Sequence, residues 1–159
     1  MEKINIICVD DQAEVLDSVI RDLRPLSKYF RIEECESAAD ATNVMSEIVA
    51  GGDFVGLVIS DHVMPGKNGV DLLGEIAKNP SLRGTKKILL TGQATHSDTI
   101  RAINDAGINS YLEKPWKPEE LLGKAKELLT SFIFEKGISY EEYMPVLDQK
   151  ILIEKLHRG

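Results

Sequence analysis

Short apolar runs alternate with stretches of helical periodicity along the first 130 residues. The runs that indicate strands are 4–9, 29–35, 54–60, 87–91 and 108–112. Between them, apolar side chains recur every three or four positions, the spacing of a helix that buries one face. The run from Ile4 to Val9 is apolar at nearly every position, which is typical of a strand covered on both faces. The alternation predicts five βα units and therefore an α/β fold with helices on both faces of a parallel sheet.

Capping residues and helix breakers agree with this periodicity. Ser37 stands where it can cap the second helix, and Gly51 follows the end of that helix. Pro25 closes the first helix, and Pro118 suits the first turn of the last one.

Residues 131–159 fall outside the five units. The stretches 139–143 and 147–156 could each form a helical turn or more, with Pro145 between them. We therefore expect a domain over residues 1–130 and a helical C-terminal extension or linker over residues 131–159.

The composition is that of an ordinary globular chain of 159 residues, with 43% apolar and 28% charged residues. This balance excludes a collagen-like repeat, a disordered tail and a disulfide scaffold. The net charge of −7 argues against direct nucleic-acid binding, which needs a basic surface. No apolar run approaches the roughly 18 residues of a membrane span, and no signal-peptide pattern opens the chain. These features favour the cytoplasm.

Cys8 and Cys35 lie in strand-like runs and are expected to be buried thiols.

Charged and hydroxyl side chains stand where the expected strands end. Asp10 and Asp11 follow the first strand, Asp61 the third, Thr91 ends the fourth, and Lys114 follows the fifth. Sites in open parallel sheets form at the carboxyl ends of the strands, so we expect these side chains to converge. Clustered carboxylates repel one another and recruit a cation. Oxygen ligands without cysteine or histidine suit Mg²⁺ rather than zinc.

The same residues lie in four longer motifs. These are Asp10-Asp11, Ile59-Ser60-Asp61-His62-Val63-Met64-Pro65-Gly66 with Gly69, Leu90-Thr91-Gly92, and Tyr111-Leu112-Glu113-Lys114-Pro115. In this order and at these spacings the chain resembles the receiver domain of bacterial two-component response regulators, over about residues 3–130. The resemblance implies a doubly wound, flavodoxin-like sheet of five strands in the order 2-1-3-4-5.

The resemblance implies a role for each site residue. Asp61 is the expected phosphoacceptor, a carboxylate nucleophile that forms an acyl phosphate. Asp11 and Asp61 are expected to bind Mg²⁺ directly, Asp10 through water, and Val63 through its backbone carbonyl. The chain would then be a signalling switch, and the reactions that it catalyses would be its own phosphorylation and dephosphorylation.

Further residues complete the implied switch. Lys114 and Thr91 would each hold a phosphoryl oxygen, because phosphoryl transfer needs positioning and charge neutralisation. Tyr111 would swing inward when Thr91 moves toward the phosphoryl group. In the family pattern, the bond before Pro115 is cis.

The implied partners are a histidine kinase or histidine phosphotransfer protein as donor and a downstream effector domain or protein as output. The sequence names neither the kinase nor the effector, and a homodimer stays open. The Lys114-Pro115-Trp116 turn is similar to that of receivers attached to larger signalling enzymes.

Neighbouring positions modify this picture. Val63 is apolar and cannot orient an attacking water, which leaves Gln93 as the candidate for that task. His62 is expected to be a solvated loop residue. Trp116 is expected to pack, with a partner contact as the alternative.

Two other classes of function share parts of the pattern. A phosphatase of the haloacid dehalogenase type also uses a strand-end aspartate with Mg²⁺, but it requires Asp-x-Asp, and Gln12 stands at the second position. A receiver-like interaction module that is never phosphorylated is the stronger alternative. Such modules usually lack the acceptor, one acid of the pair or the lysine, and all of these are present.

Overall fold

Five parallel strands form the sheet of the computed structural model, which describes residues 2–92 and 97–158. The strands are β1 (Ile4–Val9), β2 (Arg31–Cys35), β3 (Phe54–Asp61), β4 (Lys86–Thr91) and β5 (Ser110–Glu113). They lie in the order β2-β1-β3-β4-β5, and every neighbouring pair is parallel. The predicted doubly wound, flavodoxin-like fold is confirmed.

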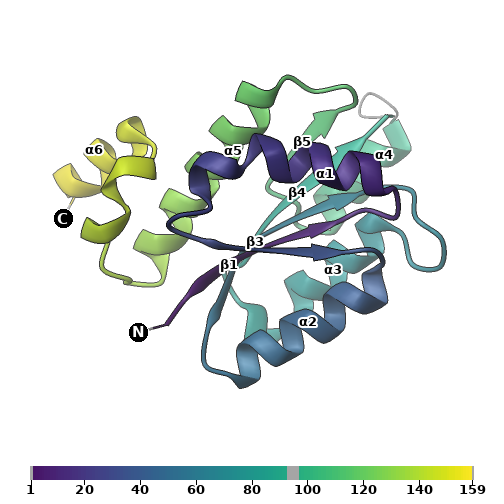
Figure 1. Cartoon of the computed structure of the whole chain (residues 1–159), viewed down its shortest axis with the longest axis horizontal. Coiled ribbons are helices and arrows are strands. Elements are labelled where there is room, and N and C mark those ends of the chain that lie inside the picture. The colour runs from purple at the N-terminus through teal and green to yellow at the C-terminus, as the bar shows by residue number, and fades with distance from the viewer. Residues whose placement is uncertain (1, 93–96, 159) are drawn as a thin grey trace.

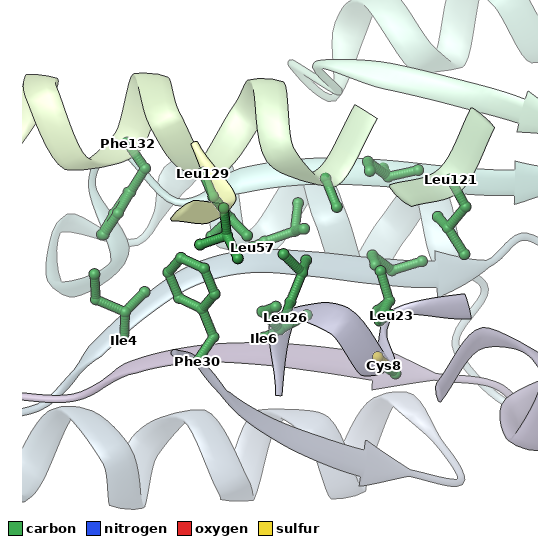
Figure 2. Packing of buried hydrophobic residues seen from close by; sticks show 14 of the residues in the cluster. Ile4, Ile6, Cys8, Leu23, Leu26, Phe30, Leu57, Leu121, Leu129 and Phe132 are labelled. Atoms are coloured by element: carbon green, nitrogen blue, oxygen red, sulfur yellow. The ribbon is translucent and has the colours of Figure 1, made fainter. Parts of the chain in front are cut away.

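Helices cover both faces of this sheet (Figure 1). α1 (Ala13–Asp22) and α5 (Pro118–Glu135) pack on one face, and α2 (Ala38–Ala50), α3 (Gly69–Lys78) and α4 (Ser97–Asp105) pack on the other. Figure 2 shows part of the first interface, where Leu57 and Phe132 lie between β3 and α5. Burial of large side chains of this kind contributes about 1.5–3 kcal/mol each, so the two packed faces supply the main stabilising free energy.

The observed element ends confirm most of the predicted ones. The Ser37 hydroxyl accepts a hydrogen bond from the backbone of Asp40 at the start of α2, and Gly51 caps the other end of that helix. Pro118 opens α5. Pro25 lies just beyond α1, in the short 3-10 helix η1 (Arg24–Leu26).

Two strands begin later than the sequence pattern predicts. β2 begins at Arg31 rather than at residue 29, because the amides of Tyr29 and Phe30 donate to the carbonyl of Leu26 in the preceding turn. β5 begins at Ser110 rather than at residue 108, since the Ile108 amide still bonds back to Ile103 at the end of α4. In both cases a local turn takes the donors that a strand would need.

The C-terminal extension joins the core at the amino-terminal end of the strands. It consists of the end of α5, which continues past residue 130, the 3-10 helix η3 (Glu141–Val146) and α6 (Gln149–Arg158). A further short 3-10 helix, η2 (Pro80–Leu82), lies between α3 and β4. Figure 1 shows α6 at the end of the molecule away from the strand arrowheads. The Tyr143 ring stacks on Phe30 with centroids 5.2 Å apart. The hydroxyl of the buried Thr130 accepts from the Asp148 amide at 2.9 Å.

The cysteines are free, buried thiols, as predicted. Cys8 lies in the cluster beneath α1 and α5, whereas Cys35 lies in the cluster beneath α2 and α3. Burial raises the pKa of both thiols, that of Cys35 to about 12, so neither is reactive at neutral pH.

Among the residues that the structure describes, none of the helices has the length and hydrophobicity that a membrane crossing requires.

Candidate functional site

Four adjacent strands carry the predicted site residues to one edge of the sheet. Asp10 directly follows β1, Asp61 ends β3, Thr91 ends β4, and Lys114 directly follows β5. Backbone hydrogen bonds hold these strand ends together. The amide of His62 donates to the Leu90 carbonyl at 3.0 Å, and the amide of Lys114 donates to the Thr91 carbonyl at 2.9 Å. The predicted convergence therefore follows from the parallel order of the strands.

Three carboxylates form the centre of the site. One oxygen from each of Asp10, Asp11 and Asp61 lies within 4.8 Å of the other two. Asp10 and Asp61 are buried, with 2% and 6% of their surfaces exposed, whereas Asp11 is exposed. Two like charges about 4 Å apart repel by roughly 4 kcal/mol at an effective dielectric constant of 20. The cluster is therefore a strongly negative position.

Asp10 experiences this field most directly. Burial raises the pKa of its carboxyl, the Gln12 amide that donates to Oδ1 at 2.9 Å lowers it, and the charge of Asp61 raises it again. The other oxygen, Oδ2, is buried and has no hydrogen-bond partner among the described residues. A buried carboxylate oxygen without a donor is costly, and this one lies in the cluster.

Lys114 brings a positive charge to the same cluster. Its Nζ lies 2.5 Å from Oδ1 of Asp61 and 3.9 Å from Oδ2 of Asp10. One ammonium opposes three carboxylates, so the ionised cluster retains two negative charges. The Lys114–Pro115 peptide bond is cis, as the family pattern predicts.

The donor set fits a divalent cation that prefers oxygen. Asp10, Asp11 and Asp61 together offer carboxylate oxygens at ligand spacing, and Oδ2 of Asp10, which accepts no hydrogen bond from the described residues, could accept one from a metal-bound water. Mg²⁺ is the cation that such a set suits, because it binds through one or two carboxylates and keeps several waters.

The loop between β3 and α3 folds back tightly on the site. The Gly69 amide donates to the His62 carbonyl at 2.8 Å, and a Cβ on Gly69 would lie 2.0 Å from the Asp61 carbonyl oxygen. Glycine is therefore required at this position. Val63 projects from the same loop with 73% of its surface exposed. The predicted role of its carbonyl remains a prediction.

His62 differs from the sequence expectation. It is half-buried rather than solvated, and its Nδ1 lies 3.2 Å from the Thr91 hydroxyl. The contact joins the ends of β3 and β4, and nothing in the local sequence signals it. Thr91 itself is 1% exposed.

The two aromatic residues near Lys114 lie in different surroundings. Tyr111 is on the outer strand β5 with 42% of its surface exposed, so its predicted switching remains a prediction. Trp116 packs against the core beneath α1, as predicted, and its Nε1 donates to Asp22 at 2.8 Å. Gln93 lies outside the described residues.

Comparisons with known proteins agree with this geometry. The family model of the response regulator receiver domain matches residues 6–126. The cyclic di-GMP phosphodiesterase response regulator RpfG of Xanthomonas campestris pv. campestris is 30% identical over an alignment 153 residues long, and this match covers 94% of this chain and 37% of that protein. The hydrogenase transcriptional regulatory protein HoxA of Cupriavidus necator is 28% identical over 123 residues, 77% of this chain and 23% of that protein.

Solved structures give the same result. The signal receiver domain of an HD domain-containing protein from Pseudomonas fluorescens Pf-5 has a TM-score of 0.72 and 29% identity, and the match covers 86% of this chain and 94% of that one. A CheY-like receiver domain protein from Methanospirillum hungatei JF-1 has a TM-score of 0.70 and 29% identity, with 85% and 99% covered. The chain spans about a quarter of the length of HoxA from two organisms.

Proposed function

The chain belongs to the response regulator receiver domain family, a family of phosphorylation-dependent signalling domains, and from this membership we propose that it is a switch that accepts a phosphoryl group on Asp61. The observation that carries the proposal is the contact of Asp61 with Lys114 beside two further carboxylates. A nucleophile, a cation and an oxygen ligand set are thus within reach of one reacting centre.

The chemistry is the transfer of a phosphoryl group to a carboxylate. A carboxylate oxygen of Asp61 forms a bond to phosphorus while the bond from phosphorus to the donor breaks, and the product is an acyl phosphate. The ammonium of Lys114 and the hydroxyl of Thr91 hold phosphoryl oxygens. Such transfer depends mainly on positioning and on charge neutralisation, which are the properties of this edge of the sheet.

Mg²⁺ is the proposed cofactor, held by Asp11, Asp61 and the Val63 carbonyl, with Asp10 acting through water. When bound, it supplies neutralisation of the charge that develops on the phosphoryl oxygens. The chain's own part is to present these oxygens from strand ends that the sheet holds rigidly.

Phosphorylation would be read out on the surface around Tyr111. We propose a histidine kinase or a histidine phosphotransfer protein as donor and an effector domain or protein as recipient of the signal. A switch of this kind turns over no external substrate.

The relatives bear on the class of output. The match to RpfG covers 94% of this chain and so reaches into the extension, whereas the match to HoxA covers 77%. We propose an output of the cyclic di-GMP phosphodiesterase type rather than a DNA-binding one. The reading frame after codon 159 tests this proposal for an output in the same chain: a phosphodiesterase domain there supports it, whereas a DNA-binding domain contradicts it.

The switch is tested with acetyl phosphate and Mg²⁺, followed by intact-mass measurement. We expect one phosphoryl adduct in the wild type, none in Asp61→Asn, and an unchanged yield in the control Asp71→Asn, which alters an exposed acid of α3. An adduct of full yield in Asp61→Asn contradicts the acceptor assignment. Absence of an adduct in the wild type would indicate an interaction module, and sustained phosphate release would indicate a phosphatase.

A further inference from the structure

His62 contacts the residue that is proposed to hold the phosphoryl group. Its Nδ1 lies 3.2 Å from the Thr91 hydroxyl, across the ends of β3 and β4. We propose that His62 is a positioning residue that holds the Thr91 side chain away from Asp61 in the unphosphorylated chain, and so opposes phosphorylation. The inference rests on the proposed function, since it assigns a control element to the same site.

The backbone on both sides of this contact is held in place. The His62 amide donates to the Leu90 carbonyl at 3.0 Å, and its carbonyl accepts from Gly69 at 2.8 Å. The Thr91 carbonyl in turn accepts from the Lys114 amide at 2.9 Å. The imidazole and the hydroxyl therefore meet because the two strand ends are bonded side by side, and the contact is a property of the fold rather than of one mobile loop.

The contact competes with the role proposed for Thr91. A hydroxyl has one proton and two lone pairs. If Nδ1 of His62 lacks a proton, it accepts the proton that a phosphoryl oxygen would need. If Nδ1 carries a proton, it donates to a lone pair of Oγ1 and leaves the hydroxyl proton for the phosphoryl oxygen. The proposal therefore requires the tautomer in which Nδ1 accepts the hydroxyl proton.

Burial strengthens the effect. Thr91 is 1% exposed and His62 is half-buried, so water does not readily replace either partner, and a hydrogen bond away from water is stronger than one in it. One such bond changes a two-state equilibrium by about 2- to 10-fold. This size suits a bias on the switch and is too small to block it.

Three variants test the proposal by the rate of adduct formation with acetyl phosphate and Mg²⁺. His62→Leu has a similar size but no polar atom, and we expect labelling about 2- to 10-fold faster than in the wild type. His62→Asn keeps a polar atom bonded to Cγ, where histidine has Nδ1. Its labelling rate should therefore stay within about 2-fold of the wild-type rate. Thr91→Val removes the other partner, so His62→Leu added to Thr91→Val should cause no further change.

The double variant measures the coupling between His62 and Thr91, and this coupling distinguishes positioning of Thr91 from a general structural effect of the substitution. Acceleration by His62→Leu that persists in the Thr91→Val background overturns the proposal, and so does slower or unchanged labelling in His62→Leu alone. If His62→Leu does not fold, His62→Ala takes its place with the same expectation. A wild type that is never labelled contradicts the proposed function instead, so the two failures are distinguishable. The imidazole ¹⁵N resonance of His62 provides a second measurement, and it should shift in Thr91→Val. No shift would contradict the contact.

Discussion

The ammonium of Lys114 lies 2.5 Å from Oδ1 of Asp61, although 53 positions separate the two residues along the chain. The contact places the cation of the site on the proposed nucleophile itself, and it places a second carboxylate, that of Asp10, at 3.9 Å from the same nitrogen. Lys114 therefore acts on both the charge of the cluster and the reacting group. Its charge should weaken Mg²⁺ binding, whereas its contact with the phosphoryl group should speed phosphorylation.

Lys114→Met should separate them. Loss of the positive charge should tighten Mg²⁺ binding by about 5-fold or more, because even a fully hydrated pair at 4 Å interacts by about 1 kcal/mol. Loss of the phosphoryl contact should slow the labelling of Asp61 by about 100-fold. Calorimetric titration and intact-mass kinetics measure the two quantities. Lys117→Met, an exposed control three positions away, should change neither, and weaker Mg²⁺ binding in Lys114→Met would contradict the electrostatic argument.

The proposed metal ligands should contribute unequally to the Mg²⁺ affinity. We expect Asp11→Ala to remove most of the Mg²⁺ affinity and Asp10→Ala to remove less, because the contact of Asp10 runs through water. Emission from Trp116, two residues beyond Lys114, can follow the titration. Asp17→Ala alters an exposed acid of α1 and serves as the control. Equal affinities in the wild type and in Asp11→Ala would refute the assignment.

The lifetime of the phosphoryl group should depend on Val63. Hydrolysis needs a water held in line with phosphorus, and the exposed valine side chain can make no hydrogen bond to such a water. Val63→Asn should shorten the lifetime, by about 10- to 100-fold at most, because the other groups of the site still stabilise the transition state. Gln93→Leu should lengthen it. Decay of the labelled protein, followed by mass, measures both, and an unchanged decay in Val63→Asn would show that water positioning does not limit the reaction.

The buried ammonium of Lys87 should lower the free energy of unfolding at neutral pH. It is 8% exposed, its Nζ donates to the Thr85 carbonyl at 3.0 Å, and the described residues form no ion pair with it. Burial lowers the pKa of this ammonium from its usual 10.5, and Lys86 adds to the effect. Between the lowered value and 10.5 the unfolded chain binds more protons, so stability rises with pH there. Below that range, the full cost of the charge is present.

Lys87→Met should therefore raise the free energy of unfolding at pH 7 by about 1 kcal/mol, and the gain should shrink as the pH approaches 10.5. Urea denaturation at several pH values measures this. Lys124→Met is the control, because Lys124 is exposed, is paired with Glu127 and does not act on Lys87; it should give no gain. A loss of stability in Lys87→Met would mean that the bond to Thr85 outweighs desolvation.

The C-terminal extension should stabilise the whole domain. Tyr143 is 7% exposed and stacks on Phe30, so Tyr143→Ala should cost about 3 kcal/mol, or roughly 10 °C in Tm. The neighbouring Met144 is 43% exposed, and Met144→Ala should cost about 0.5 kcal/mol or less. Thermal unfolding followed by circular dichroism compares the two. Equal effects would show that the extension is not part of the cooperative core.

The alternation of apolar runs and helical periods was sufficient to predict five βα units, because periodicity is a local property that each element carries in its own residues. The site could be predicted for a related reason. Parallel strands end at one edge, so Asp10, Asp61, Thr91 and Lys114 had to converge once their positions at strand ends were recognised.

Tertiary structure decided the features that depend on partners distant in sequence. No local signal indicates that His62 meets Thr91, that Trp116 bonds to Asp22, or that Tyr143 stacks on Phe30. The late start of β2 likewise depends on the Leu26 carbonyl, which takes the amides of the two residues before the strand. Sequence periodicity tells which side of an element is buried, but the partner of a side chain is set by how separate elements pack, and that arrangement exists only when the chain is folded.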